Sequence, residues 1–270
     1  MHRIVIAGAI IGFSFIVSPL YGQSCPASPA TCEVQQPQAS SSPLETILEG
    51  LQKKASELKS YECKVDYLVN QKLLESKTRR TGVLYYARFD GRSYLRVDFL
   101  TLQQDEEPQQ DYREQITFDG VWLQQISYQT QSVERRQMAE PNKPVDAFAL
   151  ASRQVPMFGF SKVEDLHKQF ETELVTDSQP EPSPFHHLHL KVKPDSIYKD
   201  DYSTIDFWVD KTLGLPAKVI AVGAEADVGE TYEIKLIEPK VNAGIDKSVF
   251  QVGIPAGFSV ETIPLEKPLK

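Results

Sequence analysis

An apolar–polar alternation with a period of two residues recurs along most of this chain and constrains its fold more than any other feature. Between Tyr61 and Val69 the odd-numbered residues are apolar, and Glu62, Lys64 and Asp66 alternate with them. This pattern favours a β-strand with one buried face. The stretches between successive alternating segments are too short to hold crossover helices, so the predicted sheet is antiparallel.

Further strands are expected throughout the chain, with helices at two places only. The expected strands lie at 61–70, 83–89, 94–99, 116–118, 122–123, 127–138 (two), 171–176, 185–193, 203–210, 216–223, 230–237, 248–252 and 258–263. Ser42-Pro43-Leu44-Glu45 is typical of a helix start, with Ser42 as N-cap, and predicts a helix of about 15 residues. A second capping box at 161–164 predicts a short helix that ends near Phe170. The fold class is therefore α+β, mainly antiparallel β.

The first residues have the three parts of a cleavable secretory signal. Met1-His2-Arg3 is basic, 4–17 is apolar, and 18–22 is turn-prone, which predicts cleavage near Gly22 and an exported, periplasmic protein. The 14-residue apolar run is shorter than the roughly 20 residues of a spanning helix. A flexible Pro/Ser/Gln leader is expected at 23–42 and one domain at 43–270.

The cysteines leave an alternative open at the leader. Lipidation at Cys25 would anchor the chain to a membrane, and a disulfide between Cys25 and Cys32 would close a small loop. Cys63 is expected to be a buried apolar side chain. Without Arg3 the chain has 28 basic and 37 acidic residues, a net charge of −9, which argues against nucleic acid as a partner.

Motifs for catalysis or metal binding are not found in the sequence, and we expect no enzyme activity, no cofactor and no metal. On a strand, His187 and His189 would share the solvent face with Lys191. Asp206 and Asp210 would lie about 13 Å apart, too far for paired acid–base work. Asp210 is expected to open a turn instead.

Arg88 has two possible placements. An exposed arginine at a strand end needs no partner. If it points inward, its guanidinium lies among apolar walls and requires a carbonyl or a ligand oxygen.

The order of short motifs resembles the periplasmic lipoprotein carrier family, the LolA-like lipoprotein localisation factors. The motifs follow one another over 44–263: Leu58-Lys59-Ser60-Tyr61, Gly82-Val83-Leu84-Tyr85-Tyr86-Ala87-Arg88, Phe118-Asp119-Gly120-x-Trp122-Leu123, Leu190-x-Val192-Lys193-Pro194, Ile205-x-Phe207-x-Val209-Asp210, Leu215-Pro216 and Phe250–Val260. Phe89 stands where the family usually has proline.

The resemblance implies a single unclosed, strongly curved β-barrel, a half-barrel, with a helical lid. Its apolar cavity would carry acyl chains of lipoproteins or other lipids between donor and acceptor proteins, as a monomer. Arg88 falls on the position of the family's lid-latching arginine, which hydrogen-bonds main-chain carbonyls, and the insert at 148–160 would supply the lid.

Eleven apolar residues are candidates for the cavity lining, with ordinary core packing as the alternative for each. They are Val65, Tyr67, Tyr85, Leu95, Val97, Phe118, Trp122, Phe148, Met157, Phe158 and Phe207. Two other functions are weighed beside the carrier: a lipid-sensing or protein-binding regulatory module on the same fold, and a membrane-anchored lipoprotein receiver.

Overall fold

A single 12-stranded sheet dominates the fold of this chain, for which a computed structural model describes residues 42–147, 163–176, 183–225 and 229–265. The strands are β1 (Ser60–Gln71), β2 (Ser76–Phe89), β3 (Arg92–Gln104), β4 (Gln110–Phe118), β5 (Trp122–Ser127), β6 (Ser132–Gln137), β7 (Phe170–Val175), β8 (Phe185–Val192), β9 (Tyr202–Asp210), β10 (Pro216–Gly223), β11 (Glu230–Val241) and β12 (Ser259–Ile263). The helices are α1 (Pro43–Glu57) and α3 (Val163–Gln169), with short 3-10 turns η1 (Lys72–Leu74) and η3 (Lys247–Phe250).

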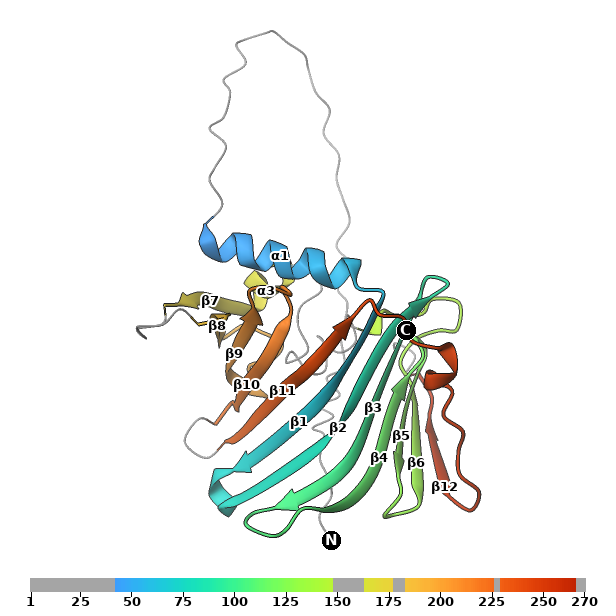
Figure 1. The fold of residues 1–270 in the computed structure, drawn as a ribbon. Helices are drawn as coiled ribbons and strands as arrows, with labels where there is room; N and C mark the ends of the chain where they lie inside the picture. Colours follow the sequence, from blue (N-terminus) through green and yellow to red (C-terminus); the bar gives the residue numbers. More distant parts are fainter. Residues whose placement is uncertain (1–41, 148–162, 177–182, 226–228, 266–270) are drawn as a thin grey trace, which may run out of the picture.

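The sheet curls into an open half-barrel, with α1 lying across one end of it (Figure 1). The strand order is β12-β6-β5-β4-β3-β2-β1-β11-β10-β9-β8-β7, so β12 and β7 are its edges. Within the described residues no ladder joins these two edges, and the barrel is not closed. The predicted fold class and the predicted half-barrel are therefore confirmed.

Helix α1 starts where the sequence predicts. Ser42 is the N-cap, and its hydroxyl accepts a hydrogen bond from the Glu45 backbone N–H at 3.2 Å. The Glu45 carboxylate lies 3.0 Å from Nε2 of His167 in α3 and so links the two helices. Leu48, and Leu58 just after the helix, are buried against the sheet and anchor α1 over it.

The concave face of the sheet carries the hydrophobic core. Its central row runs across four strands through the register pairs Cys63–Leu84, Leu84–Val97 and Val97–Ile116. Cys63, Leu84 and Val97 are all buried. One residue further along each strand points to the opposite, convex face, so the alternation seen in the sequence separates core from surface.

Gly82, which pairs with Val65 and Phe99, permits a close approach of the β2 and β3 backbones. A Cβ at this position would lie 1.8 Å from the carbonyl oxygen of Asp98 on β3. The register between β2 and β3 shifts between Thr81 and Gly82, which is the signature of a bulge. Only glycine fits here without moving one of the two strands.

The C-terminal segment departs from the predicted all-antiparallel pattern in two ways. The strand predicted at 248–252 is wrong, because Asp246 caps the 3-10 turn η3 by accepting from the Ser248 N–H at 2.8 Å. In that turn Phe250 packs against Phe89 and Tyr94 on the convex face. The following strand β12 then pairs with β6 in parallel, which the local sequence does not predict.

In the described part of the chain, no helix combines the length and apolar character that a membrane crossing requires.

Candidate functional site: the concave face and its rim

Six of the predicted lining residues lie on the concave face. Val65, Val97, Phe118 and Phe207 are buried there, and Leu95 and Tyr67 are partly buried against the same core. Leu95 pairs with Phe118 across β3 and β4. The structure thus brings these side chains together on one apolar surface under α1, and their contact with a ligand stays a prediction.

Two of the candidates do not join that surface. Tyr85 pairs with Glu62 and Arg96 on the convex face, with the Arg96 guanidinium carbon 6.0 Å from its ring centre. Trp122 is on the same convex side, where the guanidinium carbon of Arg135 lies 5.0 Å from its ring centre. Both faces of these strands carry aromatic residues, so alternation alone could not assign them to the correct face. Phe148, Met157 and Phe158 lie outside the described residues.

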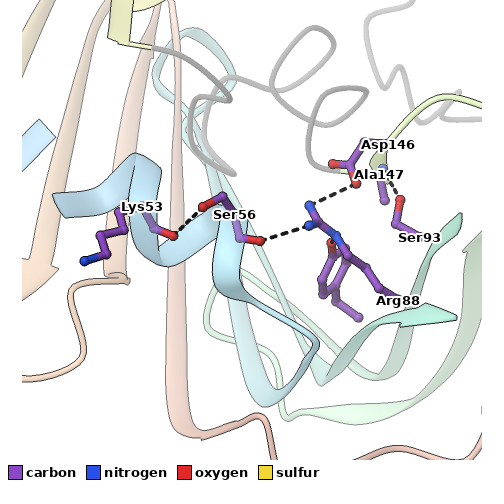
Figure 2. Close-up of polar contacts among 7 residues, drawn as sticks. Lys53, Ser56, Arg88, Ser93, Asp146 and Ala147 are labelled. Carbon is purple, nitrogen blue, oxygen red and sulfur yellow. Dashed lines mark hydrogen bonds and ion pairs between the residues drawn. The ribbon is translucent and has the colours of Figure 1, made fainter. Parts of the chain in front are cut away.

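Arg88 lies at the rim of the half-barrel, between α1 and the segment that leads to residue 148 (Figure 2). Its Nε donates to the Tyr86 hydroxyl at 2.6 Å, and one terminal nitrogen donates to the Ser56 carbonyl of α1 at 3.0 Å. The other terminal nitrogen lies 3.2 Å from Oδ2 of Asp146. One guanidinium therefore connects β2, the last turn of α1 and the residues just before 148.

Neighbouring contacts hold the same junction. The Ser93 hydroxyl accepts from the Ala147 N–H at 2.7 Å, and the Arg88 backbone N–H donates to the Lys59 carbonyl at 2.9 Å. Burial raises the pKa of Tyr86 to about 12, which keeps its oxygen a neutral hydroxyl that accepts from Arg88. The Arg88 side chain keeps 36% exposure, so this junction can be reached by solvent.

The opposite end of the concave face is polar, which sequence reasoning missed. Arg80 on β2 pairs with Tyr67 on β1, and Glu114 on β4 pairs with Phe99 on β3, the strand next to β2. Glu114 is 1% exposed and accepts a hydrogen bond from the Tyr112 hydroxyl at 2.7 Å. Burial raises the pKa of Tyr67 to about 12. Arg80 and Glu114 look like surface charges in the sequence, because the predicted strands ended before reaching them.

The histidine strand lies as predicted, with one addition. His187 and His189 are on the convex face, and Leu188 and Leu190 are in the core. His187 Nε2 and His189 Nδ1 both lie within hydrogen-bonding distance of Oδ1 of Asp206, at 2.7 and 2.9 Å. No group of three metal-binding side chains occurs in the ranges that the structure describes.

Asp210 opens the turn that the sequence predicts. Its Oδ1 accepts from the backbone N–H groups of Thr212 and Leu213, each at 2.8 Å. Gly214 follows with a φ of 65°.

Solved structures match this chain at the level of the fold. MucB aligns with a TM-score of 0.50 and 15% identity, over 82% of this chain and 66% of MucB, so this chain spans slightly less than two thirds of that protein. An uncharacterized conserved protein from Thermus thermophilus aligns over 82% of this chain and 99% of its own length, with a TM-score of 0.49 and 11% identity. A LolA superfamily protein from Nitrosomonas europaea aligns over 77% of this chain and 97% of its own, at a TM-score of 0.34 and 10% identity.

These comparisons concern the fold of the chain and not its function. No family model matches the chain, and no curated protein does. The MucB alignment, with a TM-score of 0.50, shows that the two chains share an architecture. An identity of 15% shows a shared fold alone, and what MucB binds is a property of MucB.

Proposed function

We propose that this chain is an extracytoplasmic carrier that binds acyl chains of lipoproteins or other lipids on its concave face, without catalysis. The observation that carries the proposal is an apolar concave surface in an open sheet, held at its rim by one arginine that contacts both α1 and Asp146. A carrier needs an apolar site that opens and closes reversibly, and these two features together supply it.

The apolar surface provides the binding free energy in this proposal. Burying methylene groups is worth about 0.8 kcal/mol each, so a chain of a dozen carbons gains several kcal/mol after the cost of ordering it. Val97 and Phe118 are both buried members of this apolar cluster. Bound chains would displace intramolecular packing, which keeps the net affinity moderate and release possible.

The rim provides the control of access. Arg88 donates to oxygens on three segments, and loss of the Ser56 and Asp146 contacts would free the end of α1 from the residues that precede 148. The contacts are half-exposed hydrogen bonds and one half-exposed ion pair, which are weak enough to exchange. We propose that ligand entry breaks them and that release restores them.

The compartment is part of the same proposal. A signal at 1–22 would export the chain, and a freely diffusing carrier requires cleavage near Gly22 without acylation. Mass spectrometry of the mature N-terminus checks this, because an acylated Cys25 would favour a membrane-anchored receiver over a carrier.

A pocket-blocking variant tests the binding function. Val97→Trp places an indole at the centre of the concave face, and Leu100→Trp adds the same ring on the same strand at a position that is 50% exposed. Isothermal titration with 1-lauroylglycerol should show binding by the wild type and by Leu100→Trp, and strongly weakened binding by Val97→Trp. Equal binding by all three proteins would contradict the proposal. Leu95→Trp, at a partly buried site, replaces Val97→Trp if the latter does not fold.

A protein-binding regulatory module is the second candidate. MucB, whose fold this chain shares, has been crystallised in complex with MucA. In the present chain, β12 is an edge strand with mostly exposed side chains, and such an edge can accept a further strand from a partner. Failure to bind any acyl ligand, together with stable co-purification of one protein that is lost on Val260→Pro, would favour this function over the carrier.

A further inference from the structure

Arg80 is a strongly basic side chain on the concave face, at the end away from Arg88. It lies eight residues before Arg88 on β2, which corresponds to about 26 Å along the strand. Its side chain is 12% exposed. The guanidinium carbon lies 5.9 Å from the ring centre of Phe99 and 5.5 Å from that of Tyr112. The charge is therefore held against aromatic rings inside the half-barrel.

Among the described residues, this guanidinium has an ion pair with Glu114 but no hydrogen bond. A guanidinium has five N–H donors, and in the described part of the chain none donates to a protein acceptor. Its nearest carboxylate oxygen, Oε2 of Glu114, is 3.8 Å away, beyond hydrogen-bonding distance. The Nε atom is fully buried and has no hydrogen-bond partner among the residues that the structure describes. Buried polar groups are nearly always paired, because a lost hydrogen bond to water must be replaced.

Glu114 already has its own donors. The Tyr112 hydroxyl donates to Oε2 at 2.7 Å, and Nε2 of Gln125 donates to Oε1. Further along the same face, Gln71 and the Tyr232 hydroxyl both donate to Glu230. The charge of Arg80 thus faces at least one carboxylate at short range and a second one beyond it. A third negative group would be repelled, so the unused donors of Arg80 suit a neutral oxygen acceptor.

The surroundings indicate which neutral acceptor fits. The Tyr67 and Phe99 ring centres are 6.1 Å apart beside Arg80, and Val65 and Val97 continue the surface toward α1. An acyl chain on these apolar residues would bring the atoms at its linked end to the polar end of the face. The first polar atom of an ester- or amide-linked chain is its carbonyl oxygen, which is neutral and accepts hydrogen bonds.

We propose that Arg80 donates from Nε to the carbonyl oxygen of an ester- or amide-linked acyl chain bound on the concave face. This inference rests on the proposed carrier function and deepens it, since it assigns the orientation of the chain and the chemistry of its linked end. Arg88 would control entry at the rim, and Arg80 would select linked acyl chains over plain hydrocarbon at the far end.

Two matched ligands isolate the carbonyl group. 1-Lauroylglycerol and 1-dodecylglycerol share the glycerol and a twelve-carbon chain, but the ether lacks the carbonyl oxygen. By isothermal titration, wild-type protein should bind the ester at least about tenfold more tightly, the scale of one hydrogen bond from a charged donor. Arg80→Lys keeps the positive charge beside Glu114 but removes the Nε–H, and its preference for the ester should fall to near onefold.

Control variants separate this role from general folding. Arg79→Lys changes the adjacent arginine, whose side chain pairs with Asp66 on the convex face, and should leave the ester preference unchanged. If Arg80→Lys does not fold, the double variant Arg80→Met/Glu114→Gln removes both charges together and should also lose the preference. Thermal unfolding of each variant verifies folding before titration.

Each outcome decides a separate point. Equal binding of ester and ether by wild type, or a preference that survives Arg80→Lys, would overturn the role of Arg80 and leave the carrier proposal standing. Laurate binding tighter than 1-lauroylglycerol, with the difference lost in Arg80→Lys, would make this an anion site and overturn the carbonyl assignment. Binding of none of these ligands would refute both the carrier function and this inference.

Discussion

Replacing Arg88 with leucine should loosen the end of α1 while leaving most of the sheet intact. The change removes hydrogen bonds to the Tyr86 hydroxyl and the Ser56 carbonyl, each worth about 1 kcal/mol. It also removes the ion pair with Asp146, which adds less than about 0.5 kcal/mol because both side chains keep 36% exposure. Since the Tyr86 bond lies within β2 and only the Ser56 bond reaches α1, the local opening free energy of α1 should fall by about 1 kcal/mol.

Hydrogen exchange measures this opening directly. A loss of about 1 kcal/mol corresponds to roughly fivefold faster exchange, and we expect it at the amides of the last two turns of α1. Amides in the centres of β9 and β10 should exchange as in the wild type, since no contact of Arg88 reaches them.

The matched control is Arg79→Leu on the same strand. Arg79 donates twice to the Asp66 carboxylate on the convex face, so its loss removes a comparable set of contacts far from α1. An unchanged exchange rate of the α1 amides in Arg88→Leu would refute the role of Arg88 in holding the end of α1. Equal acceleration of these amides in both variants would refute it too. Arg88→Lys, which keeps the charge but only part of the hydrogen bonding, should give an intermediate rate.

Three further predictions concern the sheet. Phe118→Ala should lower the free energy of unfolding by about 3–5 kcal/mol, because the ring is 2% exposed. The control Leu100→Ala, at a 50% exposed site, should change it by less than about 1 kcal/mol. Urea titration measures the free energy of unfolding of both variants. Gly82→Ala should prevent folding or cost more than about 3 kcal/mol, since its Cβ would meet the Asp98 carbonyl oxygen; a soluble protein with wild-type stability would contradict the close approach of β2 and β3. The free energy of unfolding should fall as the pH rises from about 9 toward 12. Burial raises the pKa of Cys63 from 9.0 to about 12 and the pKa values of Tyr67 and Tyr86 from 10.0 to about 12, so these groups ionise first in the unfolded chain. A flat profile of urea midpoints above pH 9 would argue against their burial.

The sequence predicted those elements whose signals are local. The N-cap at Ser42, most of the period-two strands and the Asp119-Gly120 turn depend on neighbouring residues, and the structure has these where they were expected, with the segment 248–252 and one of the two strands at 127–138 as exceptions. In that turn Oδ1 of Asp119 accepts from the N–H groups of Val121 and Trp122, and Gly120 has a φ of 93°. The antiparallel order follows from short connections in the same local way.

Features that depend on distant residues escaped prediction. The parallel pairing of β12 with β6 joins residues about 127 positions apart, and neither strand's own sequence predicts it. β2 and β3 extend well beyond their predicted limits, because charged residues such as Arg79 and Arg80 interrupt the apolar pattern. Arg79 pairs with Asp66 across the ladder, and Arg80 is enclosed by rings, so both are accommodated by contacts that the local pattern does not reveal.

The candidate site shows the same division. The predicted cavity lining included Val65, Val97 and Phe118, which share the concave face, and also Tyr85 and Trp122, which lie on the convex face, because alternation could not decide between two aromatic faces. The partners of Arg88 come from α1 and from Asp146, which lie 32 and 58 residues away. A family resemblance suggested its position at a latch, and only the three-dimensional arrangement supplies the oxygens that it contacts.

Native mass spectrometry with lipid extraction, on mature protein purified from its own cell envelope, tests the carrier function most directly. The account predicts co-purifying acyl chains that are present in the wild type and in Leu100→Trp and are lost in Val97→Trp. Protein that emerges free of lipid, and remains so after incubation with 1-lauroylglycerol or a diacylated lipopeptide, would contradict it.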